Sequence, residues 1–209
     1  MKPLVVLIDS GVHLEHPHLR GSDVTIGPTF VTEVPDHDID AGTDTLGHGT
    51  CATAALLDLA PSARVLSLKV FGDDARCSVE ALLAAIDATL ALDPPPQYLL
   101  MPLGLRDRRA ASVLRPRVAE AKSRGITVVA PLLHQQLPSY PGSLPGAVGV
   151  LVDVRLPREA PERRDGMWFA SPHPRDLPSI ERDRNLRGAS FAAANLVGAW
   201  IAGVPQEEE

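Results

Sequence analysis

The stretch LVVLIDSG at residues 4–11 decides the fold of this chain. Its first five residues form an unbroken apolar run, which is typical of a strand buried on both faces of a parallel sheet. Asp9 follows where this strand ends, and the ligand-binding and catalytic groups of α/β sheets gather at that carboxyl edge. The sequence therefore predicts that the first strand carries a carboxylate to the functional edge of a sheet.

Strands and helices alternate along the rest of the chain. Apolar runs predict further strands at residues 63–70, 98–103, 126–130, 147–154 and 167–170. Helices are predicted at residues 49–59, 78–91, 113–123 and 188–202, and the remaining stretch 155–187 is expected to be an irregular excursion around its one strand. This alternation favours a three-layer α/β fold, with a mostly parallel sheet flanked by helices on both faces.

Size and composition fit one domain, predicted at residues 1–204, followed by a disordered acidic tail at 205–209. The chain has 209 residues and a formal charge of −6, which gives no reason to expect a nucleic-acid or anionic-membrane partner. No apolar run is long enough to span a bilayer, and no signal peptide opens the sequence. Cys51 and Cys77 are too few for a disulfide framework, so we expect a cytoplasmic protein with free thiols.

Two more segments carry chemistry, DTLGHGT at residues 44–50 and GASFA at residues 188–192. The first places His48 between two glycines at the start of a helix, where the backbone can approach closely. The second places Ser190 at the N-terminus of an apolar helix, where backbone N–H groups and the helix dipole favour developing negative charge.

Acyl transfer needs these three residue types. A serine hydroxyl requires an adjacent base, histidine titrates near neutrality, and a buried aspartate fixes the imidazole tautomer. Taken singly, Asp9 suits a turn former, His48 a capping or core histidine, and Ser190 an N-cap. Taken together, the chain order Asp, His, Ser is one of the known orders of catalytic triads. We predict Asp9, His48 and Ser190 as the catalytic triad.

These motifs resemble those of the subtilases, the subtilisin-like serine peptidases, over almost the whole chain. The resemblance implies a serine endopeptidase with a subtilisin-like fold and without a cofactor. The segments that carry it are Asp9-Ser10-Gly11, Gly47-His48-Gly49-Thr50, Ala60-Pro61-Ser62-Ala63, Leu68-Lys69-Val70, Met101-Pro102-Leu103-Gly104, Tyr140-Pro141-Gly142 and Gly188-Ala189-Ser190-Phe191-Ala192.

The resemblance also implies a groove in which an extended peptide pairs with two strand edges. One edge would be Pro102, Leu103 and Gly104, and the other would be Ala75, Arg76 and Cys77. Leu103 with Ala130, Pro131 and Leu132 would line an apolar and fairly small first specificity pocket.

The oxyanion hole departs from the family pattern, which usually supplies an asparagine side chain after the strand at residues 126–130. A gapless match puts His134 at that position, and Gln135 beside it has an equivalent amide donor. Donation by His134 or Gln135 and a hole without a side-chain donor both remain open. Losing one such donor typically costs about 10²–10³ in turnover.

Metal and anion sites are not predicted. Asp36, Asp38, Asp40 and Asp44 alternate as calcium ligands can, but no EF-hand pattern is present and a solvated loop is favoured. The two cysteines lack a matched ligand set for zinc. Five arginines between residues 106 and 117 fit a solvated helix face better than a phosphate site, because no aromatics are interleaved with them.

The function predicted from the sequence is cleavage of a particular cytoplasmic peptide or precursor. The absence of a pro-segment before the first strand supports an intracellular enzyme. The alternatives are a peptide-binding pseudoenzyme, suggested by the missing asparagine, and a subunit of a larger complex, with a protein partner or a second copy replacing the loops of larger relatives.

Overall fold

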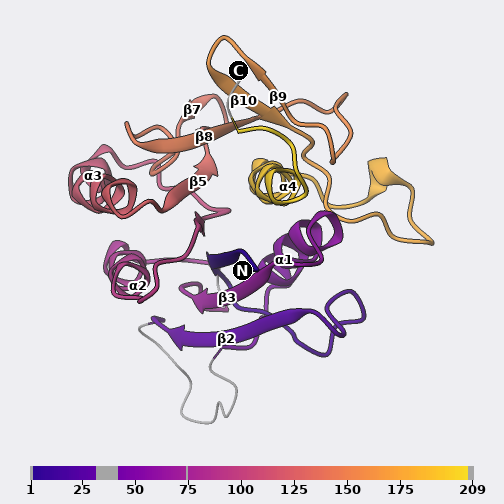
Figure 1. Cartoon of the computed structure of the whole chain (residues 1–209), viewed down its shortest axis with the longest axis horizontal. Helices are drawn as coiled ribbons and strands as arrows, with labels where there is room; N and C mark the ends of the chain where they lie inside the picture. The colour runs from indigo at the N-terminus through magenta and orange to yellow at the C-terminus, as the bar shows by residue number, and fades with distance from the viewer. Residues whose placement is uncertain (1, 32–41, 74, 207–209) are drawn as a thin grey trace.

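The computed structural model describes residues 2–31, 42–73 and 75–206. Its centre is an eight-stranded sheet with the order β2-β3-β1-β4-β5-β8-β10-β9 (Figure 1). All neighbouring pairs are parallel except β9 and β10. The strands are β1 (Leu4–Asp9), β2 (Asp23–Thr29), β3 (Arg64–Lys69), β4 (Tyr98–Leu100), β5 (Thr127–Pro131), β8 (Ala147–Val152), β9 (Glu162–Arg164) and β10 (Met167–Ala170).

Helices cover both faces of the sheet, so the predicted three-layer α/β architecture is confirmed. One core layer contains side chains of α1 (His48–Leu59) and α4 (Ala189–Ile201), and the other contains those of α2 (Val79–Leu90) and α3 (Arg108–Ser123). Figure 1 shows the two helix pairs on opposite sides of the strands. None of the helices in the described ranges combines the length and the apolarity needed to cross a membrane.

Strand β1 lies between the two core layers, which explains its unbroken apolar run. Val5 and Leu7 pack with α1 and α4, whereas Val6 and Ile8 pack with α2 and α3, and each is at most 1% exposed. The chain then builds β2 and β3 on one side of β1 and β4 on the other. Asp9 ends β1 at this reversal of strand order, where open α/β sheets form their ligand crevice.

Several elements differ from the prediction. Helix α3 starts at Arg108 and not near residue 113, because the Asp107 carboxylate accepts a 2.8 Å hydrogen bond from the Arg109 N–H and caps the helix. Strand β2 was not predicted, since it is an edge strand with mostly exposed side chains and no apolar run. The short strands β6 (Leu133–His134) and β7 (Leu137–Pro138) form an unpredicted hairpin.

The stretch 155–187 is more regular than predicted. It contains the hairpin β9–β10, whose turn consists of Asp165 and Gly166, both at positive φ. A two-residue Asp-Gly turn is among the strongest hairpin signals in a sequence. The 3₁₀ helix η1 (Arg182–Arg184) also lies in this stretch.

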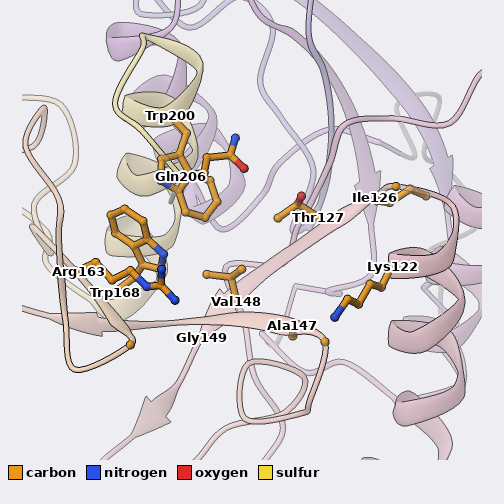
Figure 2. A pocket seen from close by; sticks show the side chains of 13 residues that line it. Lys122, Ile126, Thr127, Ala147, Val148, Gly149, Arg163, Trp168, Trp200 and Gln206 are labelled. Carbon is orange, nitrogen blue, oxygen red and sulfur yellow. The ribbon is translucent and has the colours of Figure 1, made fainter. Parts of the chain in front are cut away.

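An aromatic cluster lies at the C-terminal end of α4 (Figure 2). The Trp200 ring meets Trp168 edge-on at 5.2 Å and stacks on Tyr98 at 6.2 Å. The Gln206 side-chain amide donates to the Tyr98 hydroxyl. Gln206 thus contacts the sheet although it is itself exposed, and residues 207–209 of the predicted acidic tail lie outside the described residues.

Candidate active site

Asp9 and His48 form a hydrogen-bonded pair, in which Asp9 is buried and the His48 side chain is 36% exposed. The Asp9 side chain is 0% exposed, and both of its oxygens lie close to His48 Nδ1, Oδ1 at 2.8 Å and Oδ2 at 2.9 Å. The backbone N–H of Ser10 also donates to Asp9 Oδ1, at 2.7 Å. A carboxylate that accepts from Nδ1 holds the proton on that nitrogen, so Nε2 is left as the basic atom of the ring.

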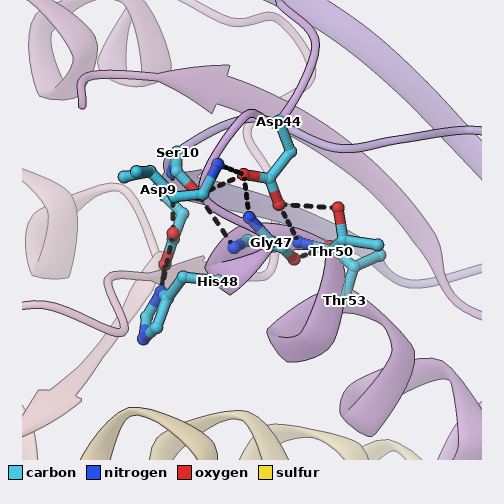
Figure 3. A network of polar contacts seen from close by, with 9 residues as sticks. Asp9, Ser10, Asp44, Gly47, His48, Thr50 and Thr53 are labelled. Carbon is cyan, nitrogen blue, oxygen red and sulfur yellow. Dashed lines mark hydrogen bonds and ion pairs between the residues drawn. The ribbon is translucent and has the colours of Figure 1, made fainter. Parts of the chain in front are cut away.

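Asp44 anchors the start of α1 to the end of β1 (Figure 3). One carboxylate oxygen accepts from the backbone N–H of Leu46 and Gly47 and from the Ser10 hydroxyl, and the other accepts from the N–H and hydroxyl of Thr50. The Ser10 Oγ in turn accepts from the Gly49 N–H at 2.9 Å. This network accepts hydrogen bonds from backbone N–H groups at the start of α1 that have no partner within the helix, and it sets the position of His48.

The role of Asp44 differs from the acidic loop to which the sequence assigned it. Its carboxylate is occupied by protein donors. The other residues of that loop, Asp36, Asp38 and Asp40, lie outside the described residues. A carboxylate shortly before a helix start was the signal that could have identified this anchor.

Gly49 allows α1 to press against β1. A Cβ atom at this position would lie 2.2 Å from the backbone oxygen of Gly11 and 3.2 Å from the Asp9 Cβ. The first contact is shorter than any that packed atoms tolerate, and its partner is backbone that cannot rotate away. Glycine at 49 is therefore a condition for the Asp9–His48 contact.

Gly49→Ala is expected to lower the free energy of unfolding by about 1–3 kcal/mol, the usual cost of forcing extra atoms into a packed site. A thermal unfolding curve should show the Tm falling by several degrees. Gly188→Ala is the matched control, because Gly188 has extended backbone and its nearest neighbour to an added Cβ is 4.0 Å away. Equal Tm values for Gly49→Ala and wild type would contradict this packing argument.

Ser190 lies in the first turn of α4 and shares a pocket of about 560 Å³ with Asp9 and His48. The ring of Phe191, the next residue, lies 5.5 Å from the His48 ring between centroids. Among the described residues, no hydrogen bond joins Ser190 to His48. Such bonds often form only when substrate is present.

The predicted substrate residues divide into two groups. Five of them line the same pocket as the triad candidates, namely Pro102, Leu103, Gly104, Ala75 and Pro131. The other four are not among its lining residues, namely Arg76, Cys77, Ala130 and Leu132. The pocket is completed by residues that the sequence did not single out, namely Leu46, Phe71, Leu133 and Ser139.

Ala130 lies on the other side of the sheet from the pocket, because alternate residues of a strand face opposite sides. Ala130 is 0% exposed and packs in the core with α2 and α3. Cys77 packs against that same core, and burial raises the pKa of its thiol to about 12. Burial, together with the charges of Asp44 and Asp9, also raises the pKa of the Cys51 thiol. Both thiols are unpaired and stay protonated near neutrality.

The predicted oxyanion donors lie on the β6–β7 hairpin. Gln135 and Gln136 form its turn at positive φ, and the exposed Gln135 side chain accepts a 3.2 Å hydrogen bond from Arg106 Nη1. This hydrogen bond occupies the amide oxygen of Gln135 and not its N–H groups, and Gln135 is not among the residues that line the pocket. The side chain of His134 lies outside the described part of the structure.

The Arg158 side chain forms hydrogen bonds with both of the helices that carry His48 and Ser190. Its guanidinium, only 5% exposed, donates to Asp58 and the Ala55 carbonyl of α1, both at 2.7 Å, and to Asn195 of α4 at 3.1 Å. The sequence placed this residue in an irregular surface segment. Its partners lie 37 to 103 residues away, so no local pattern could reveal the contact.

The pKa of His48 is raised above its ordinary value. Burial alone lowers this pKa, but the charge of Asp9, the hydrogen bond with Asp9 and the charge of Asp44 outweigh burial. A buried carboxylate that stabilises the imidazolium makes the ring a stronger base. The pair is therefore suited to accept a proton from a hydroxyl in the same pocket.

Comparison with known proteins supports the fold and adds no close relative. No family model matches the chain, and no curated protein sequence matches it. Among solved structures, the chain is similar to the protease domain of PatA in its S218A mutant, with a TM-score of 0.68 and 19% identity over 96% of this chain and 78% of that one.

Two further solved structures are similar to the same degree. The prenylagaramide maturation protease PagA gives a TM-score of 0.69 and 19% identity over 96% of this chain and 74% of its own. A cold-adapted subtilisin-like serine proteinase gives a TM-score of 0.68 and 18% identity, over 93% of this chain and 72% of its own. The chain therefore has the fold of subtilisin-like serine proteases, as the sequence motifs predicted.

Proposed function

We propose that this protein is a subtilisin-type serine endopeptidase that cleaves a particular cytoplasmic peptide or precursor. The observation that supports this most directly is the hydrogen-bonded Asp9–His48 pair, which shares a pocket with Ser190 at the carboxyl edge of the sheet. The two unpaired cysteines suit a reducing compartment.

In the proposed reaction, the Ser190 hydroxyl oxygen attacks the carbonyl carbon of the scissile bond while its proton passes to His48 Nε2. Asp9 keeps the ring oriented and stabilises the imidazolium that forms. His48 then gives the proton to the departing amine, and an ester between Ser190 and the substrate acyl group remains. Water attacks this ester with His48 again as base, which releases the acid and restores the serine.

The negative charge on the carbonyl oxygen needs donors. The backbone N–H groups at the start of α4 supply positive potential beside Ser190. Because Gln135 is not among the residues that line the pocket, we expect slower turnover than in an enzyme with a dedicated side-chain donor, by about 10²–10³.

The pocket favours an apolar residue before the scissile bond. Leu103, Pro131 and Leu133 line it, and Ser139 adds a single hydroxyl. Pro102 has no N–H, so one rung of backbone pairing with an extended substrate is missing. One of the similar solved structures, PagA, is a maturation protease, which supports a precursor as the substrate class here.

A cleavage assay tests the proposal. Wild type and Ser190→Ala are incubated with a pool of defined peptides and with unfolded casein, and new peptide ends are identified by mass spectrometry. We expect wild type alone to cleave a small set of peptides after apolar residues. Equal cleavage of casein and of all peptides by wild type would argue against narrow specificity. Cleavage by both wild type and Ser190→Ala would refute the proposed role of Ser190.

The proposal also predicts the pH dependence of kcat/KM. Activity requires neutral His48, so it falls as the pH drops through the pKa of this ring. Because that pKa is raised, the acid limb should lie above the ordinary value of 6.5. Asp44→Asn removes one of the charges that raise the pKa, so its limb should move to lower pH. An acid limb that stays in place in Asp44→Asn would show that Asp44 does not act on His48 through its charge.

A peptide-binding pseudoenzyme is the second candidate. The position of Gln135 favours it, because Gln135 is not among the residues that line the pocket and the oxyanion site then lacks this donor. It predicts that the protein binds peptides in the same pocket with no turnover in either wild type or Ser190→Ala.

A further inference from the structure

A second pocket, of about 710 Å³, lies far from the catalytic candidates (Figure 2). Strand β5 connects the two pockets, since Thr127 lines this one and Pro131 lines the other. At about 3.3 Å per residue, these strand ends are about 13 Å apart. Helix α4 connects them too, because Trp200 lines this pocket and Ser190 the other, a separation of about 15 Å at 1.5 Å per residue.

The pocket is basic although the chain is acidic. Lys122 and Arg163 line it, none of its lining residues is a carboxylate, and Figure 2 shows the two cations on opposite walls. Within the described part of the chain, neither cation has a hydrogen bond or ion pair. The neighbouring Arg164 differs, because it pairs with Asp153 and Glu162. Arg163 and Lys122 are thus available to an external anion.

The aromatic wall holds further unused hydrogen-bonding groups. Trp168 and Trp200 are 8% and 6% exposed, and the Trp200 N–H is buried without a partner. The Trp168 N–H also has no partner among the described residues. Buried indole N–H groups usually find an acceptor, so the Trp200 N–H is an unsatisfied donor of this wall, whereas the Trp168 N–H is not among the buried unpaired groups.

The floor offers backbone to an extended chain. Strand β8 starts at Ala147, but its pairing with β10 begins only at Val150. Residues 147–149 therefore have β5 on one side and, within the described ranges, no strand partner on the other. Four of the lining residues are glycines, which add no side chain to the pocket, namely Gly125, Gly146, Gly149 and Gly166. A free strand edge recognises extended peptides through main-chain hydrogen bonds.

We propose that this pocket binds an acidic segment of the peptide substrate, with one carboxylate on Lys122 and another on Arg163. Two cations on opposite walls suit a chain with two separated carboxylates better than one compact anion. This inference rests on the proposed peptidase function. Because the pockets are about 15 Å apart and an extended chain spans about 3.3 Å per residue, the acidic segment lies at least about five residues from the scissile bond.

Intrinsic fluorescence tests the inference, because the only two tryptophans of the chain both line this pocket. The Ser190→Ala protein is titrated with a blocked hexapeptide of six glutamates, with the corresponding lysine hexapeptide and with free glutarate. The same titrations are made on this protein carrying Lys122→Gln and Arg163→Gln. The matched control carries Arg108→Gln and Arg115→Gln, two exposed cations of α3 that lose the same charge elsewhere.

The glutamate peptide should change the emission and bind at least tenfold more weakly to the Lys122/Arg163 variant, while the α3 control binds as the parent protein does. If the α3 control bound the glutamate peptide as weakly as the Lys122/Arg163 variant does, the binding would be nonspecific charge attraction, and the proposed site would be refuted. If free glutarate saturated the site at the same carboxylate concentration as the peptide, the ligand would be a small anion, and the assignment to a peptide segment would be refuted. Covalent labelling of Ser190 in wild type is scored separately. Labelling without peptide binding refutes this inference alone. Binding without labelling refutes the peptidase and the identification of the bound peptide as its substrate, but leaves the acidic-peptide site.

Discussion

Ser190→Ala is expected to lower kcat for a cleaved peptide by about 10⁴–10⁶-fold, because it removes the atom that forms the acyl-enzyme. The protein should stay folded, since Ser190 is only half-buried and makes no hydrogen bond with His48 among the described residues. Turnover is measured at saturating peptide, and unfolding curves confirm equal stability.

Two comparisons sharpen this expectation. Ser112→Ala, at an exposed serine of α3, should leave kcat unchanged. Adding His48→Ala to Ser190→Ala should cost little more, because triad residues act as a unit. A loss of less than tenfold in Ser190→Ala would mean that another group attacks the substrate.

Asp9→Asn is expected to lower kcat by about 10⁴-fold at neutral pH with little change of shape. The carboxylate accepts from His48 Nδ1 at 2.8 Å, whereas an amide nitrogen at the same place donates to that atom. The proton then moves to Nε2, and the ring can no longer accept the serine proton.

The matched control for Asp9→Asn is Asp23→Asn, at an exposed carboxylate of β2. Its kcat should equal that of wild type. If Asp9→Asn kept more than a tenth of wild-type turnover while its Tm was unchanged, Asp9 would not orient the catalytic base.

The parts of the fold that could be predicted are those where local sequence and burial agree. Strand β1 is apolar throughout because it lies between two cores, and α4 is apolar because ten of its residues are buried. Strand β2 lacks such a signal, since it is held at an edge by backbone pairing with β3 and leaves its side chains exposed. The Asp165-Gly166 turn did carry a signal, and the proline- and arginine-rich surroundings obscured it.

The candidate site divides in the same way. Asp9, His48 and Ser190 each lie at the end of a regular element, so their approach follows from the topology of a parallel sheet. The supporting contacts are long-range. Arg158 reaches Ala55 across 103 residues, and Ser10 reaches Asp44 across 34, and nothing in either local sequence predicts the partner. Side-chain direction at Ala130 and Gln135 depends on strand phase and turn geometry, which residue type alone does not set.

The central claim is that Ser190 is an activated nucleophile, and intact-mass labelling with a fluorophosphonate tests it most directly. Wild type and Ser190→Ala are incubated with the probe while folded, and the mass of each is measured. We predict one adduct on wild type and none on Ser190→Ala. No adduct on folded wild type, or an adduct on both proteins, would contradict the assignment of Ser190 as the nucleophile.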